Sequence, residues 1–531
     1  MRLGKNNNLI EGVFMSKTMR LMANKWFVLL ANTVFFIIMA IVLPIHFETN
    51  DDVTMCEIAN GRFSGRPDAH LVFINALLGW LLAALYRMTC IVEWYTLVLC
   101  VLHVVAFTGV VYFIINDSRI HKLLKLLLIL FVYVLWIRMI VGFQFTTTAG
   151  ALCCCGCMAL LQPSKKCKVL GVAFVLIASL VRFSAAGLVG LLFAPFFVMF
   201  FLKDRKYVIW LIVVLVTVLS GKMADKGFYQ DDNWAKYMEY NHLRSVVQDN
   251  PKGKEVLYHL PQGIVKEDYE LFVWFIGDPQ VITTEMLKVV KGTMHEDGYL
   301  DNLTSNLDGL VKYRVSLFFL CIGFLIGIFM NVKQKRTVWA WVLCGELILF
   351  SLILLGISMN WIVKERVFLC MLLPTVYVLV SALPDRMSPH LILFSSIMVG
   401  LASKYIYQDY KLIGAVREGR EYVEKYQIPL VAGREEKVFS IEFWEQYLPP
   451  FGIMDLDYNV RGLGWSAMSP LNKGILESHL DLADSTWVIL TRLDDPPIKI
   501  GNAIERNYGK KVAIKLINYN EKYAIYKFET E

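Results

Sequence analysis

The sequence lacks the glycine-rich phosphate motifs of nucleotide-binding proteins. It contains no Walker loop, and the stretch Gly462-Leu-Gly464 stops short of a Gly-x-Gly-x-x-Gly motif. ATP-driven transport and a cytosolic nucleotide-sugar site therefore lose support, and no nucleotide cofactor is expected. Charged residues are also scarce, at 19% against 56% hydrophobic residues, a balance that no class of soluble protein matches.

Cysteine is absent from two long polar regions, residues 223–312 and 409–531. Nearly all of the eleven cysteines lie instead within apolar stretches. A free cysteine in such a place usually acts as a small apolar packing residue, so neither a disulfide framework nor a metal or redox centre is expected. The need for a divalent cation stays open at this point.

Apolar runs of 17 to 24 residues recur from Trp26 to Ile406. Because about 20 apolar residues cross the hydrocarbon core of a bilayer, the sequence predicts a mainly α, polytopic helical membrane protein. About eleven spans are predicted, near residues 26–46, 93–115, 123–143, 145–162, 169–183, 185–202, 207–222, 313–332, 337–357, 366–383 and 389–407.

The net charge of +7 reports membrane topology and not a nucleic-acid partner, because the lysines and arginines form short clusters between apolar runs. The basic arm of residues 1–25 is therefore expected in the cytoplasm. The short apolar run 70–86 decides the side of everything after it. If this run spans, four later basic clusters fall outside; if it is interfacial or re-entrant, all four fall inside, which is the preferred reading.

The polar regions then share the outer compartment with the first outer loop, residues 47–92. The large outer loop 223–312 opens with an expected interfacial amphipathic helix near residues 229–244. In the tail, strand-like segments begin near residues 438, 485, 511 and 522 and flank a short helix, which is typical of a small α/β domain. The predicted organisation is a cytoplasmic arm (1–25), a transmembrane domain (26–408) and an extracytoplasmic α/β domain (409–531).

Adjacent carboxylates, Asp51 and Asp52, follow the first span where the membrane ends and water begins. Asn50-Asp51-Asp52, together with Pro67-Asp-Ala-His70, resembles the first outer loop of the GT-C superfamily of membrane glycosyltransferases. The order of spans, interfacial segment and external tail is similar as well. The double proline that often follows the histidine in one branch is absent, since Leu71 and Val72 stand there. The chain is closer to uncharacterised bacterial members with an Asn-Asp-Asp start.

The resemblance implies transfer of a sugar, usually with inversion, from a polyprenyl-phosphate donor to a glycan, lipid or protein acceptor. The location implied is the outer face of the bacterial cytoplasmic membrane. The acceptor hydroxyl must lose a proton as it attacks the anomeric carbon, which calls for a carboxylate base. Asp51 matches the first acidic residue of the superfamily loop and is expected to be the base. Asp52 is the second catalytic candidate, with positioning of the acceptor, assistance to a metal or helix capping as its possible roles.

Cations at the outer ends of spans are candidates for binding the donor phosphate. Arg366, Arg182 and Lys364 stand at such ends, and arginine suits bidentate contacts to phosphate. Snorkelling of long side chains to the interface is the alternative, and it is favoured for Lys364 in particular. Further contacts to donor or acceptor are assigned to His70, Asn50, Glu48 and Arg244.

Two other classes of function compete with an enzyme. Glu346 lies in the middle of a span, where a charge is costly. With Arg182 it could line the path of a transporter or flippase for a lipid-linked or anionic substrate, unless it forms a structural pair with Arg138. The internal repeats common in transporters are absent. A non-catalytic scaffold for envelope assembly is the third reading.

Overall fold

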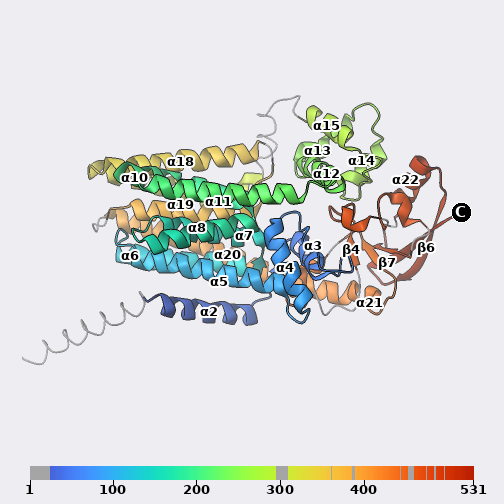
Figure 1. The fold of residues 1–531 in the computed structure, drawn as a ribbon, viewed down its shortest axis with the longest axis horizontal. Coiled ribbons are helices and arrows are strands. Elements are labelled where there is room, and N and C mark those ends of the chain that lie inside the picture. The colour runs from blue at the N-terminus through green and yellow to red at the C-terminus, as the bar shows by residue number, and fades with distance from the viewer. Residues whose placement is uncertain are drawn as a thin grey trace, which may run out of the picture.

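The computed structural model describes residues 24–294, 309–359, 361–384, 389–442, 444–452, 460–473, 475–483, 486–495 and 497–531. Most of the predicted cytoplasmic arm, and residues 295–308 of the large loop, lie outside the described residues. Long apolar helices form one bundle, and the polar segments gather at one end of it (Figure 1). The predicted fold class, a polytopic helical membrane protein with a small C-terminal α/β domain, is confirmed.

The bundle helices coincide with the predicted spans. Among the described residues, seven helices are long and apolar enough to cross a membrane: α2 Lys25–Val42, α5 Trp94–Asn116, α6 Lys122–Val141, α11 Tyr207–Phe228, α17 Arg314–Lys333, α18 Thr337–Ser358 and α19 Glu365–Ala382. The pair α9 Phe183–Leu192 and α10 Ala194–Lys203, bent by 53°, adds an eighth if it crosses as one broken span. These helices account for eight of the about eleven predicted spans. The remaining three predicted spans fall on α7 Phe145–Leu160, α8 Lys165–Val181 and the first part of α20 Pro389–Tyr426.

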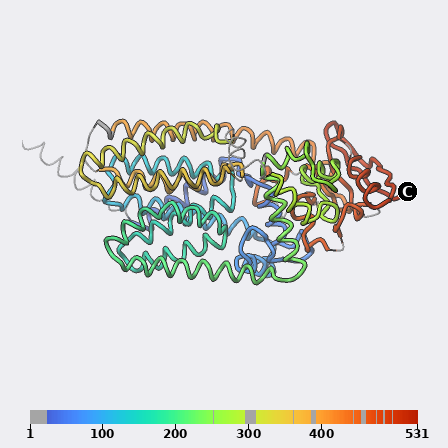
Figure 2. The backbone as a smooth tube through the Cα atoms, turned by 90° about the horizontal axis from the view of Figure 1, so that it is seen from above, coloured from blue at the N-terminus to red at the C-terminus, as the bar shows by residue number. Residues whose placement is uncertain are grey.

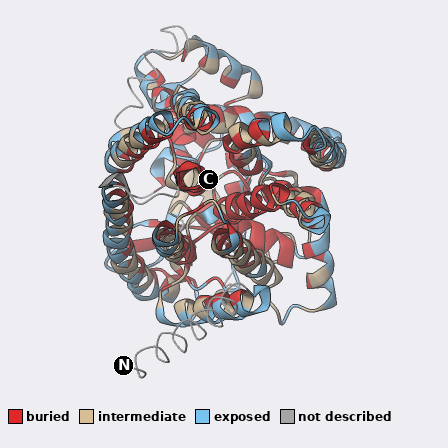
Figure 3. Ribbon diagram, turned by 90° about the vertical axis from the view of Figure 1, so that its left-hand side faces the viewer, coloured by how far each residue is buried: buried red, intermediate tan, exposed pale blue. Residues whose placement is uncertain are grey.

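Helix α7 lies in the middle of the bundle, because each of its 16 residues is buried. Seen along the bundle, buried residues fill the centre and exposed residues cover the outside (Figure 3). The close approach of α7 to α8 depends on two small residues, since a Cβ at Gly156 would lie 3.0 Å from the carbonyl oxygen of Gly171. A helix surrounded by protein need not match the thickness of the lipid, which explains why α7 is short.

Helices α3 Asn50–Asn60 and α4 Ala76–Met88 lie at the polar end of the bundle (Figure 1). The backbone N–H of Ala76 donates to Oδ1 of Asp225, near the end of α11, at 2.9 Å. Helix α5 begins at the same end, where the Thr96 hydroxyl donates to the carbonyl oxygen of Pro450 in the C-terminal domain at 3.1 Å. Residues 70–86 therefore do not cross the bundle, as predicted.

A helical module, residues 232–294, follows α11. Its elements are α12 Asp232–Gln248, α13 Pro251–Glu255, η1 Val256–Tyr258, α14 Lys266–Val273 and α15 Thr284–Thr293. The predicted amphipathic helix is α12, and its apolar face packs on protein where the prediction had placed it on the membrane surface. Trp234 stacks on His70 with ring centroids 4.1 Å apart, and the Tyr237 hydroxyl donates to the Trp465 carbonyl oxygen at 2.8 Å.

The C-terminal domain is reached through α20, whose 38 residues continue from the bundle into the domain (Figure 2). Arg420 of α20 donates to the carbonyl oxygens of Tyr447 at 3.1 Å and Ile45 at 2.9 Å. The helix is thus attached to the domain and, through Ile45, to the segment just before the first outer loop.

The domain is built on a five-stranded sheet in the order β4-β3-β5-β7-β6. Strand β3 pairs in parallel with β4 and β5, while β7 pairs antiparallel with β5 and β6. The four predicted strands and the helix are present, and β4 was missed. The elements are α21 Ile428–Val431, β3 Val438–Ser440, η2 Glu445–Tyr447, β4 Val460–Gly462, η3 Pro470–Asn472, η4 His479–Leu482, β5 Val488–Arg492, α22 Ile498–Tyr508, β6 Val512–Tyr519 and β7 Tyr523–Thr530.

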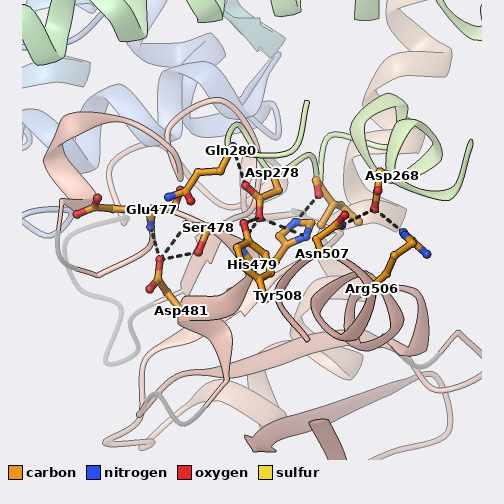
Figure 4. A network of polar contacts seen from close by, with 11 residues as sticks. Asp268, Asp278, Gln280, Glu477, Ser478, His479, Asp481, Arg506, Asn507 and Tyr508 are labelled. Carbon is orange, nitrogen blue, oxygen red and sulfur yellow. Dashed lines mark hydrogen bonds and ion pairs between the residues drawn. The ribbon is translucent and has the colours of Figure 1, made fainter. Parts of the chain in front are cut away.

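A buried polar network joins the helical module to the C-terminal domain (Figure 4). Asp278 of the module, 3% exposed, accepts hydrogen bonds from the backbone N–H of His479 at 2.7 Å and from the Tyr508 hydroxyl at 2.8 Å. The His479 ring donates from Nε2 to the Ile276 carbonyl oxygen at 2.8 Å, and burial lowers the pKa of this imidazole. Asp268 adds contacts to side chains of α22. The network fixes the orientation of the helical module relative to the C-terminal domain.

We expect Asp278→Ala to loosen this junction. The substitution leaves the His479 N–H and the Tyr508 hydroxyl without their acceptor, and each hydrogen bond lost to a charged group costs about 1.5–3 kcal/mol. Limited proteolysis of the purified protein should then cut the C-terminal domain free faster than in the wild type. Asp494→Ala, at an exposed position of the same domain, is the matched control. Equal cleavage rates in the two variants would contradict the role of the network.

Candidate active site

A cavity of about 640 Å³ lies where the bundle, the helical module and the C-terminal domain meet. We call it the polar cavity. The walls come from the starts of α3, α7 and α19, the second half of α12, the turn after α14 and the ends of β3 and β4. Because these segments are far apart in the sequence, the cavity exists only when all three parts are assembled.

Asp51 lines the polar cavity, and one of its oxygens is held by a side chain of the C-terminal domain. The indole Nε1–H of Trp465 donates to Oδ1 of Asp51 at 3.0 Å. Trp465 is itself fixed, since Tyr237 binds its carbonyl oxygen at 2.8 Å and its ring meets that of Phe73 edge-on at 4.9 Å. The carboxylate therefore has a defined orientation in the cavity, which a general base requires.

Asp52, the second catalytic candidate from the sequence, does not line the cavity. Successive residues on a helix point about 100° apart. Asp52 therefore lies on a different face of α3 from Asp51, and this face is fully buried. Its Oδ1 accepts from the Tyr95 hydroxyl at 2.9 Å and from the backbone N–H of Phe145 at 3.2 Å, and its Oδ2 accepts from Thr49 at 3.3 Å. Burial raises the pKa of Asp52 well above its usual range, although the hydrogen bond from Tyr95 opposes this shift.

The neighbours of the carboxylates divide between cavity and core. Asn50 is exposed and lines the polar cavity. Glu48 does not line it; its backbone N–H donates to Phe143 at 3.0 Å beside the short parallel pair β1 His46–Phe47 and β2 Gly142–Phe143. Burial raises the pKa of the Glu48 carboxyl, and the charge of Arg366 opposes that rise. Glu48 therefore contributes to the electrostatics around Arg366 from outside the cavity.

The three predicted phosphate-binding residues come together. Arg182, Lys364 and Arg366 all line the polar cavity. Lys364 forms an ion pair with Asp249 at 3.1 Å, and Arg182 lies over the rings of Phe73 and Phe145 at 5.3 and 5.4 Å. Arg366 has no hydrogen-bond or ion-pair partner within the part of the chain that the structure describes. Its guanidinium is thus available to an anion.

A second cavity of about 640 Å³, the apolar cavity, adjoins the polar one. Six residues line both cavities: Thr146, Arg182, Asp249, Trp361, Lys364 and Arg366. Beyond them the apolar cavity extends between α9, α18 and α19, lined by side chains such as Leu188, Leu191, Ile353 and Ile357. The basic residues therefore stand at the boundary between a polar and an apolar space.

Of the two remaining candidate residues, Arg244 lies in the polar cavity and His70 lies outside it. Arg244 lines the polar cavity, where its Nε donates to Asn241 at 2.9 Å. His70 does not line the polar or the apolar cavity. Its ring is 2.6 Å from Asp68 and lies between Trp234 at 4.1 Å and Phe228 at 4.3 Å. Enclosure by aromatic rings indicates a packing role for His70.

The charged residues within the bundle do not pair as expected. Glu346 accepts a hydrogen bond from the Thr375 hydroxyl at 3.0 Å and lines neither cavity. Arg138 pairs with Glu365 at 2.9 Å, next to Arg366, so the Glu346–Arg138 pair is wrong. Glu346 and Arg182 therefore do not share a path. Among the described residues, no group of three or more His, Cys, Asp or Glu side chains comes together that could hold a metal ion.

Sequence reasoning missed Trp465 and two other aromatic residues of the wall, Trp274 and Phe275. A signal existed for the first, since Trp465 directly follows Gly462-Leu-Gly464, which the sequence analysis considered only as an incomplete nucleotide motif. The two glycines instead bring the backbone of the C-terminal domain to the cavity. Trp274 and Phe275 carry no motif that would have distinguished them.

No protein-family model matches this sequence, and no curated protein matches it either. Among solved structures, the crystal structure of ArnT from Cupriavidus metallidurans in the apo state aligns with 93% of this chain and 97% of that chain. The sequence identity is 10% and the TM-score 0.41. A likeness of this degree carries no functional information, so the function has to be argued from the cavities.

We expect Asp52→Asn to fold, because the amide oxygen can accept the hydrogen bonds from Tyr95 and Phe145. In the unfolded chain Asp52 loses its proton near pH 4, whereas in the folded protein its raised pKa means that the proton is lost only at higher pH. The contribution of Asp52 to stability therefore falls as the pH rises from about 4 through the folded-state pKa. The variant should lack this part of the pH dependence. Thermal unfolding in detergent at several pH values measures it. Identical pH profiles for variant and wild type would contradict the buried, protonated state of Asp52.

Proposed function

We propose that this protein is a membrane glycosyltransferase that moves a sugar from a polyprenyl-phosphate donor to an extracytoplasmic acceptor. The observation that carries the proposal is that Asp51 lines the same cavity as Arg182, Lys364 and Arg366, and that these cations also line the apolar cavity. A polyprenyl-phosphate sugar has the same order of parts: an apolar chain, an anionic phosphate and a polar sugar. The two cavities fit that order.

In the proposed reaction, the basic residues hold the phosphate at the boundary, with the chain in the apolar cavity and the sugar in the polar one. The acceptor hydroxyl oxygen forms a bond to the anomeric carbon while its proton passes to Asp51. The bond from that carbon to the phosphate oxygen breaks, and the electron pair leaves with the phosphate. Attack from the side opposite the phosphate inverts the anomeric centre. Arg366 stabilises the charge on the leaving phosphate through its planar guanidinium.

Two residues support the base without touching substrate. Trp465 orients Asp51 by donating to Oδ1 at 3.0 Å. Asp52 is assigned a positioning role, because it ties the start of α3 to Tyr95 of α5 and to the backbone of Phe145 at the start of α7. Asn50 and Arg244 remain contacts for donor or acceptor, since both line the polar cavity. Glu48 and His70 are reassigned to electrostatic support and packing.

We place the polar cavity on the extracytoplasmic side of a bacterial cytoplasmic membrane and the N-terminus inside. The support is the distribution of charge: the connections α5–α6, α7–α8, α10–α11 and α17–α18 turn at the end of the bundle away from the cavity (Figure 1). Basic residues of these connections include Arg119, Lys122, Lys165, Lys203 and Lys333. Positive charge accumulates on the cytoplasmic side of membrane proteins. The same architecture supports membership of the GT-C superfamily that the first outer loop resembles.

Asp51→Asn is expected to abolish transfer while leaving the fold intact. The amide oxygen still accepts from Trp465, but the side chain no longer takes a proton, and general-base catalysis contributes about 100- to 10,000-fold. The measurement is release of polyprenyl phosphate from a panel of radiolabelled polyprenyl-phosphate sugars by proteoliposomes supplied with envelope extract as acceptor. Asp52→Asn is the neighbouring control and should keep most of the activity. Full activity of Asp51→Asn would exclude it as the base.

Arg366→Gln is expected to weaken donor binding. Loss of charge-assisted contacts to the phosphate should lower the affinity for polyprenyl phosphate by about 10- to 100-fold. Binding of fluorescent polyprenyl phosphate to the purified protein measures this. Arg314→Gln is the control, because Arg314 is an exposed arginine at the start of α17 that lines neither cavity. If both variants bind the lipid equally well, Arg366 does not hold the phosphate.

A further inference from the structure

Two exposed aromatic residues stand on the wall of the polar cavity. Trp274 is 68% exposed and Phe275 is 47% exposed, and both line the cavity at the turn that follows α14. Large apolar side chains exposed side by side in a polar site are unusual and mark binding surfaces. They lie on the helical module, whereas the apolar cavity lies within the bundle, on the other side of the shared basic residues.

Phe275 has a strained backbone conformation, and its side chain is not buried, so packing does not compensate for the strain. Helix α14 ends with the Ile276 N–H bonded to the Leu271 carbonyl oxygen at 2.9 Å, which puts Phe275 in the left-handed region with φ +64°. Glycine is the usual residue at this position, because a Cβ is unfavourable there. A phenylalanine that was selected for packing would be buried, yet about half of this side chain is exposed. Strain of this kind is typical of functional sites.

The C-terminal domain forms another part of the cavity wall. Gly462 and Gly464 of the C-terminal domain line it, and a Cβ at Gly464 would meet nothing within 4 Å. A ligand can therefore approach the backbone directly. Polar side chains of α12, among them His242 and Ser245, border the same space, as does Asp51. The polar cavity thus offers both aromatic rings and hydrogen-bonding groups.

We propose that Trp274 and Phe275 form a subsite for a sugar ring of the acceptor, so that the acceptor is a glycan and not a peptide or a lipid. This inference rests on the proposed glycosyltransferase function. A pyranose ring has an apolar C–H face that stacks on aromatic rings and hydroxyl groups at its edge that need hydrogen-bonding partners. The chain of a lipid acceptor would need a continuous apolar groove, and the polar cavity does not provide one because Asp51, Arg244 and the polar residues of α12 interrupt its lining. An extended peptide would need an open sheet edge or a row of pockets.

The test is binding of four soluble trisaccharides, chitotriose, cellotriose, maltotriose and mannotriose, to the full-length protein in nanodiscs. Saturation-transfer NMR identifies a bound sugar and shows which of its protons touch the protein. We expect at least one trisaccharide to bind at millimolar concentration through the C–H protons of one ring face. Trp274→Ala and Phe275→Gly should each weaken this binding by about tenfold or more. Tyr258→Ala, at another exposed aromatic of the module, should not change it.

Phe275→Gly separates a binding role from a structural one. Because glycine relieves the strained φ, the melting temperature of this variant should be equal to or higher than that of the wild type while sugar binding is lost. A lower melting temperature would mean that the side chain serves packing and would overturn the proposal. So would unchanged sugar binding in Trp274→Ala and Phe275→Gly, or the absence of binding by all four trisaccharides.

Failure of the subsite can be distinguished from failure of the proposed function. If sugar binding is absent but release of polyprenyl phosphate still depends on Asp51, the enzyme stands and its acceptor is not a glycan held by these rings. If the wild-type protein releases polyprenyl phosphate from no donor of the panel, the glycosyltransferase proposal itself fails, and the subsite fails with it as an acceptor site.

Discussion

The hydrogen bond between the Trp465 indole and Asp51 depends on nearly every part of the molecule. Trp465 belongs to the C-terminal domain, Asp51 to the first outer loop, and Tyr237 of the helical module fixes the tryptophan from behind. No two of these parts alone would orient the carboxylate. The polar cavity is therefore a product of domain docking, and the buried junction around Asp278 contributes to it although it lies outside the cavity.

Adjacent carboxylates at the start of α3 have opposite environments. Asp51 faces the cavity, whereas Asp52 faces the core, where hydrogen bonds from Tyr95 and Phe145 compensate in part for its burial. The step of about 100° between successive helical residues produces this division. Asp52 thus attaches to the core the helix on which Asp51 faces the cavity.

Much of the fold follows from the sequence, because the spacing of apolar runs depends on the bilayer and hardly on tertiary structure. The helices fall where they were predicted, and the segment 70–86 was interpreted as interfacial or re-entrant from the four basic clusters that follow it in the sequence. The site was predicted less well. The face of α3 that carries Asp52 is fixed by Tyr95 and Phe145, and the partner of Asp51 is 414 residues away in sequence. Similarly, His70 looked like a ligand because its aromatic neighbours Phe228, at the end of α11, and Trp234, in α12, are distant in sequence.

Helix α20 has a mechanical consequence. It runs for 38 residues from the bundle into the C-terminal domain, and Arg420 fastens it to Tyr447 in that domain and to Ile45 beside the first outer loop. An unbroken helix resists bending, so α20 is a rigid connection between the bundle and the domain and not a flexible linker. If α20 tilted in the bilayer, its far end would shift sideways together with the part of the cavity wall that contains Trp465. Membrane thickness would in this way act on the width of the cavity.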